Sequence, residues 1–162
     1  MKARGVVFVH SSPTAVCPHV EWAISGVLGT AVSLQWTPQP AVPGQLRTEC
    51  TWTGPAGSGG ALAGALRAWT MLRFEVTEEP SSGVDGERFC YVPTLGLWRG
   101  RTSANGDIMV GEDQLRALLA EVSSAQLPVR VHDLLGSAWD DALEPFRWAG
   151  DGAPATWLHQ VG

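Results

Sequence analysis

The stretch from Gly5 to Gly29 restricts the possible folds of this chain more than any other part of the sequence. It opens with Val6-Val7-Phe8-Val9, a β-branched and aromatic run that does not alternate with polar residues. Such a run is typical of a strand that other elements cover. A polar turn follows, and the next apolar residues recur at the spacing of one helix face: Val20, Ile24, Val27 and Leu28. The stretch therefore predicts a buried strand, a short loop and an amphipathic helix that stops at Gly29.

The chain then continues with the same kinds of element. Residues 32–36 and 46–53 alternate between two faces, which predicts two strands that each bury one side. A glycine-rich loop at 54–60 leads into a second apolar helix face, and residues 71–78 predict a further strand. The resulting βαββαβ order is that of the ferredoxin-like folds, in which an antiparallel sheet carries both helices on one face. We therefore expect an α+β protein with a ferredoxin-like half over residues 1–80.

The second half of the sequence predicts an extension of that sheet by a β-hairpin. Residues 87–92 and 97–102 are strand candidates, and Asn105-Gly106 is a strong hairpin signal. Ile108-Met109-Val110 is then the returning strand. Apolar residues at helical spacing between Leu115 and Val122 predict an amphipathic helix after the hairpin.

The tail from Pro128 to Gly162 predicts one or two short helices and an irregular end. An apolar stripe begins at Trp139, and Pro145 should end or bend the helix that carries it. A tail so rich in tryptophan is expected to pack on the rest of the protein. A chain of 162 residues is long enough for one core. We expect a single α+β domain over residues 1–162, in which residues 84–162 form the hairpin and C-terminal helices packed on the first half.

Composition excludes several classes of protein. A formal net charge of −5 and a pI of about 5.3 argue against a nucleic-acid-binding protein, which usually has a basic face. The N-terminal apolar run ends at Val9, too early for a secretory signal, and no stretch approaches a membrane span. Cys17, Cys50 and Cys90 are far apart and odd in number, which fits neither a disulfide framework nor a zinc ribbon. We expect a cytoplasmic protein with reduced thiols that binds neither nucleic acid nor membrane.

The densest group of reactive side chains comes from the first strand and helix. His10 follows the strand, while Cys17, His19 and Glu21 lie at the start of the helix. Imidazole, thiolate and carboxylate groups are ligands of borderline metals, and a cysteine near a histidine can be an activated nucleophile. The spacing matches no metal motif, which favours a structural histidine and a buried cysteine as the explanation of these residues. The sequence assigns no metal to this group and leaves any cofactor unknown.

A second candidate site is the loop that precedes the second helix. Ser58, Gly59 and Gly60 would place backbone N–H groups at the helix N-terminus, where anions bind, with Ser58 as the N-cap. The loop lacks the lysine of a phosphate-binding P-loop and is not a dinucleotide fingerprint. A flexible connection between strand and helix is therefore the alternative interpretation.

A third candidate is a surface for a binding partner. Arg99 and Arg101 share one strand face, where they can hold a carboxylate or phosphate of a ligand or partner. Trp139 is added to this surface because tryptophan is enriched at interfaces. The alternative for the arginines is solubility and salt bridging with the acidic excess. Asp140 and Glu144, one helical turn apart, are best explained as a solvated acidic face.

Four segments resemble one known family over nearly the full length of the chain: VCPHVEWAISGVLG, LRFEVTEEP, NGDIMVGEDQLRALL and WDDALEPFRWAGDGAPATWLHQV. The chain is similar to an uncharacterised actinobacterial domain-of-unknown-function family, number 3145. The family has no assigned activity, so no residue inherits a role from it. The resemblance implies a cytoplasmic bacterial protein with a link to fatty-acid metabolism, because some relatives are encoded near genes of fatty-acid synthesis.

No motif in the sequence declares a reaction, since it contains no G-x-S-x-G, no H-E-x-x-H and no dinucleotide fingerprint. This favours a non-catalytic ligand-binding or protein-interaction module, such as an accessory or regulatory subunit. A protein partner or a homo-oligomer is expected, and a small-molecule ligand is also open. The alternative is a small enzyme or metal-binding protein that uses His10, Cys17, His19 and Glu21.

Overall fold

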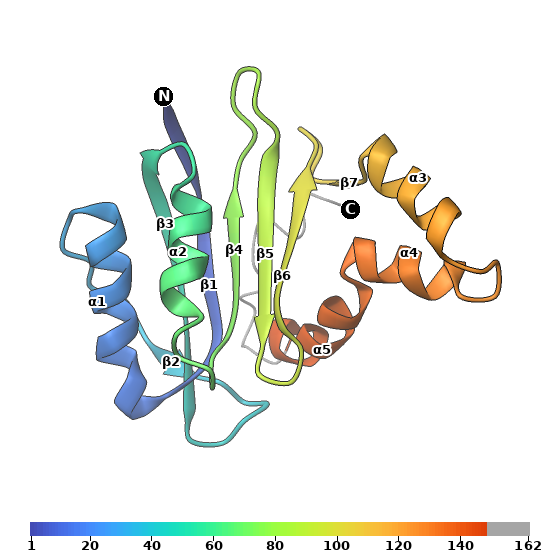
Figure 1. Cartoon of the computed structure of the whole chain (residues 1–162). Helices are drawn as coiled ribbons and strands as arrows, with labels where there is room; N and C mark the ends of the chain where they lie inside the picture. The colour runs from blue at the N-terminus through green and yellow to red at the C-terminus, as the bar shows by residue number, and fades with distance from the viewer. Residues whose placement is uncertain (149–162) are drawn as a thin grey trace.

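The computed structural model describes residues 1–148, in which seven strands form one antiparallel sheet (Figure 1). The strands are β1 (Lys2–Pro13), β2 (Thr37–Pro38), β3 (Gln45–Pro55), β4 (Arg73–Glu78), β5 (Gly86–Val92), β6 (Gly96–Thr102) and β7 (Ile108–Met109). The helices are α1 (Cys17–Leu28), α2 (Ser58–Leu66), α3 (Glu112–Glu121), α4 (Leu127–Leu135) and α5 (Ser137–Trp148), and a 3₁₀ turn, η1 (Thr14–Val16), precedes α1. The order across the sheet is β2-β3-β1-β4-β5-β6-β7. The predicted mixture of helices with an antiparallel sheet is thereby confirmed.

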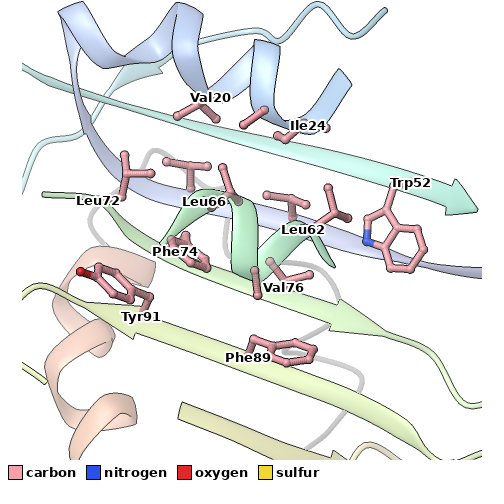
Figure 2. Close-up of a cluster of buried hydrophobic side chains, with 14 of the residues drawn as sticks. Val20, Ile24, Trp52, Leu62, Leu66, Leu72, Phe74, Val76, Phe89 and Tyr91 are labelled. Atoms are coloured by element: carbon pink, nitrogen blue, oxygen red, sulfur yellow. The ribbon is translucent and has the colours of Figure 1, made fainter. Parts of the chain in front are cut away.

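The main core lies between one face of the sheet and the helices α1 and α2. Phe74 and Val76 of β4 are fully buried there, and Phe89 and Tyr91 of β5 continue the layer (Figure 2). Burying an apolar side chain of this size contributes about 1.5–3 kcal/mol. The helices close the layer with four fully buried side chains: Val20 and Ile24 of α1 and Leu62 and Leu66 of α2.

The strand predicted at residues 32–36 is wrong. The backbone N–H of Val32 donates to Ser25 Oγ at 2.9 Å, and the N–H of Leu34 donates to Glu21 Oε1 at 3.0 Å. These bonds hold the segment against α1, so pairing with β3 is limited to β2. Because β2 has only two residues, the ferredoxin-like assignment of the first half stays a prediction.

The hairpin predicted at Asn105-Gly106 is confirmed, since β6 and β7 pair on either side of it. The N–H of Ser103 donates to Asp107 O at 2.9 Å, and Gly106 adopts a φ of 85°, which favours glycine. Pro145, in contrast, does not end the last helix, because α5 continues through it to Trp148. The irregular end predicted for residues 149–162 lies outside the described residues.

The other face of the sheet, here called the α5 face, is covered at β5 and β6 by α5. Cys90 and Trp98 lie on this face and pack with Leu143, which is fully buried. The helices α3 and α4 instead extend beyond the β6–β7 edge (Figure 1), and Leu118 is the buried side chain of that pair. Within residues 1–148, no helix is both long and apolar enough to cross a membrane.

Candidate functional site

The side chains predicted as one reactive cluster have separate partners. His10 is fully buried on the α5 face, where its Nε2 lies 2.6 Å from Glu75 Oε2. Cys17 is the first residue of α1, and its Sγ lies 3.6 Å from Ser12 Oγ. Burial raises the pKa of the Cys17 thiol, whereas an activated nucleophile needs a lowered pKa.

The other two members of that predicted cluster also contact other residues. His19 is exposed and stacks on Trp69, with 4.7 Å between the ring centroids. Glu21 accepts a hydrogen bond from Trp36 Nε1 at 3.1 Å, in addition to the bond from the backbone of residue 34. In the part of the chain that the structure describes, no group of three or more His, Cys, Asp or Glu side chains is placed to hold a metal ion. The structure therefore does not bring the four predicted residues into one site.

The glycine-rich turn before α2 binds a carboxylate of the protein itself. The N–H groups of Gly57 and Gly59 donate to Glu78 at 3.0 and 2.9 Å. Gly57, with a φ of 93°, is the N-cap, and Ser58 is the first helical residue, whose Oγ donates to Pro55 O at 2.7 Å. The predicted chemistry, an anion held by amides at a helix start, is present, but Glu78 already occupies these amides.

A buried group of charges that no local sequence pattern indicates surrounds Glu75 on the α5 face. Glu75 is fully buried and accepts hydrogen bonds from His10 Nε2, from Arg88 Nη2 at 3.0 Å and from Arg147 Nε at 3.1 Å and Nη2. Asp140 of α5 accepts further bonds from Arg88 at 2.8 Å and from Arg147 at 3.0 Å. We call these five residues the Glu75 cluster. It joins strands β1, β4 and β5 to α5.

The charges of the Glu75 cluster balance with His10 neutral, because two guanidiniums face two carboxylates. Burial lowers the pKa of His10, and the charge of Arg147 acts in the same direction against the raising effect of Glu75. Burial alone would raise the pKa of Glu75, but the hydrogen bond from His10 and the charge of Arg147 outweigh it and hold that pKa well below its ordinary value. Glu75 is therefore an ionised acceptor, and neither group changes its charge near neutral pH. This supports a structural role for the cluster.

A groove lies at the opposite edge of the sheet from β2. It has a volume of about 860 Å³ and runs between β6 on one side and α3 and α4 on the other. Residues 98–101 of β6 and Met109 line the sheet side, while Leu118, Arg130 and Leu134 line the helix side. We call it the edge groove. Its walls combine apolar side chains with guanidinium groups, as binding sites commonly do.

The structure places two of the three predicted partner-surface residues at the edge groove. The side chain of Arg101 is half exposed, and its Nη1 lies 4.0 Å from Asp85 Oδ2. Arg99 is also exposed and pairs with Glu87. Trp139 lies elsewhere, since it packs on the α5 face and its Nε1 donates to the backbone oxygen of residue 96 at 2.9 Å. The arginines and the tryptophan therefore do not form one surface.

The comparisons with known proteins identify a family without an assigned function. Neither a curated protein nor a solved structure matches the chain. Residues 6–160 match the model of a family described as a protein of unknown function, DUF3145. Because this match spans most of the chain, the protein belongs to that family.

Proposed function

We propose that this member of the DUF3145 family is a non-catalytic binding module, and that the edge groove is its binding site. The observation that carries the proposal is the groove itself. It gathers Arg99, Arg101 and Arg130 beside a single acidic lining residue, Asp133, in a chain whose net charge is −5. A group of guanidinium side chains next to apolar walls, in an acidic chain, is typical of a surface that selects a partner.

The helices that form the outer wall of the groove add support, because they leave apolar side chains uncovered. Leu119 of α3 is 70% exposed and Val129 of α4 is 63% exposed. Met109, which lines the groove, is 47% exposed. Exposed apolar side chains on neighbouring helices support a contact with another molecule. We infer that the partner covers α3 and α4 as well as the groove, as expected of an accessory or regulatory subunit.

The experiment is affinity isolation of the tagged protein from its own cells, with quantitative mass spectrometry of what is recovered. Two groove variants, Met109→Asp and Arg130→Glu, should reduce the recovery of specific partners by at least about fivefold, which corresponds to ~1 kcal/mol. Met71→Asp and Arg67→Glu are matched controls. Met71 is 42% exposed, Arg67 is also exposed, and neither residue lines the edge groove. Both controls should behave like the unchanged protein.

Circular dichroism of all four variants checks that each remains folded. Equal recovery of partners by the groove variants and by the controls would overturn the assignment of the groove. A partner lost only from a control variant would move the binding site to the α2 end of the protein.

A further inference from the structure

We propose that the edge groove binds an extended peptide that adds to β6 as a further strand and carries alternating acidic and apolar side chains. This inference rests on the proposed function, since it names the class of partner for the same groove.

The outer edge of β6 is only partly paired. β6 pairs with β5 along its whole length, but with β7 only at Arg101 and Thr102. In an antiparallel ladder the backbone groups of successive residues point to opposite sides. The N–H of Ser103 bonds toward the β7 side, so the groups of Arg101, Arg99 and Leu97 point to that side as well. Arg99 and Leu97 lie beyond the last residue that β7 pairs with.

The chain leaves this edge at the position where β7 would continue. Gly111 would be the next residue opposite Arg99, but it is the N-cap of α3. Its N–H donates to Gln114 Oε1 at 2.9 Å, and its C=O accepts the N–H of Leu115 at 3.2 Å. Within residues 1–148, no strand therefore pairs with the outer side of β6 at Leu97 and Arg99. Such an edge is a template for strand addition, and the edge groove runs along it.

The side chains beside this edge define the peptide that fits. Arg99 and Arg101 lie on one face of β6, and Trp98 lies on the other face. In an added strand, residues on the arginine face would be acidic, and alternate residues would pack on Trp98 and on Leu134 of α4. Arg130, which forms no ion pair among the described residues, adds positive charge to the same groove.

The same charges disfavour a second copy of this chain as the occupant. Pairing of two β6 edges would bring Arg99 and Arg101 of one copy against the same arginines of the other. Like charges directly opposite one another destabilise a strand pair. An acidic segment of a different protein avoids this repulsion.

The test is a titration of the ¹⁵N-labelled full chain with an acetylated and amidated heptapeptide of alternating glutamate and valine, followed by NMR. Amide signals of Leu97 and Arg99 should shift on binding. Two versions of the peptide are then methylated on every second backbone nitrogen, in the two possible phases. In an added strand, only one of the two sets of backbone nitrogens faces β6. The peptide methylated on that set should lose at least about tenfold in affinity, while the other should bind within about twofold of the parent peptide.

The role of charge is tested with a double variant of the protein and a second peptide. The double variant Arg101→Glu/Arg130→Glu should weaken binding of the glutamate peptide by roughly fivefold to tenfold and should gain affinity for the matching lysine–valine peptide. Arg67→Glu serves as the control and should change neither affinity. A double variant that binds both peptides as the unchanged protein does would overturn the acidic assignment.

The outcomes separate this inference from the proposed function. Equal binding of the two methylated phases would overturn strand addition while leaving the groove as a binding site. Absence of binding by any of the peptides, combined with loss of cellular partners from Met109→Asp, would overturn the class of occupant and leave the binding module in place. Absence of both effects would overturn both proposals.

Discussion

Replacing Glu75 with glutamine tests how α5 is held against the sheet. Glu75 lies on β4 and accepts hydrogen bonds from His10, Arg88 and Arg147, of which Arg147 belongs to α5. Glutamine keeps the shape of the side chain but removes its charge. It also directs an amide donor at groups that are themselves donors. The substitution therefore removes the buried negative charge that holds α5 to the sheet.

The expected cost follows from burial and from the remaining partners. Each hydrogen bond to a charged group contributes about 1.5–3 kcal/mol, and breaking a buried ion pair by removing one partner costs about 3–5 kcal/mol. These values are not additive, and Asp140, with 40% of its side chain exposed, keeps its bonds to both arginines. We therefore expect Glu75→Gln to lower the free energy of unfolding by about 3–5 kcal/mol, against a typical total of about 5–15 kcal/mol for a domain.

The assay is urea unfolding followed by tryptophan fluorescence, because Trp98 and Trp139 both report on the packing of α5. Glu79→Gln is the matched control: it breaks the exposed pair with Arg4 and should cost less than about 1 kcal/mol. In a double-mutant cycle, Glu75→Gln and Arg147→Gln together should cost less than the sum of the two. If Glu75→Gln lowers the free energy of unfolding no more than Glu79→Gln does, the reasoning is refuted.

Two further predictions concern acid and the start of α2. Burial lowers the pKa of His10 below its ordinary value of 6.5. On acidification the unfolded state therefore takes up a proton that the folded state excludes, and the free energy of unfolding falls. At lower pH, protonation of Glu75 lowers the free energy of unfolding further. His10→Gln should make the urea midpoint of unfolding depend less on pH between about pH 7 and pH 5. An unchanged pH dependence of that midpoint would contradict this assignment. Gly59→Ala should cost about 1–2 kcal/mol, because its Cβ would lie 3.0 Å from Glu78 Cβ and disturb the carboxylate bonded to the α2 amides. Gly64→Ala, where nothing lies within 4 Å, should instead raise the melting temperature, so equal melting shifts in the two variants would exclude this explanation.

Periodicity predicted the elements well where burial and backbone pairing coincide. α1 ends before Gly29, whose φ is 68°, as the sequence indicates. The segment at residues 32–36 alternates in the same way but forms no strand. Val32, Leu34 and Trp36 do pack on the main core, which explains their alternation, but the backbone bonds to side chains of α1. Alternation reports which side chains are buried, and it does not distinguish a strand from an extended segment that lies on a helix.

The predicted reactive cluster shows a different limit, because neighbours in sequence are not neighbours across a sheet. Val7 and Val9 face α1 and α2, so His10 lies on the opposite face from the helix that carries Cys17 and His19. The alternation along β1 contained this information.

The Glu75 cluster had no local signal, since its members come from β1, β4, β5 and α5 and meet only in the folded protein. The alternation of Phe74 and Val76 places Glu75 on the other face of β4, which a sheet with helices on one face would expose to water. Burial of that face by α5 converts an ordinary strand glutamate into the centre of an ion network. The position of α5 also affects the edge groove, because α4 directly precedes α5 in the chain. Gly136, between the two helices, lies against Trp98, and a Cβ there would come within 2.7 Å of the ring. The wall of the proposed binding site is thus positioned by a helix that buried charges hold in place.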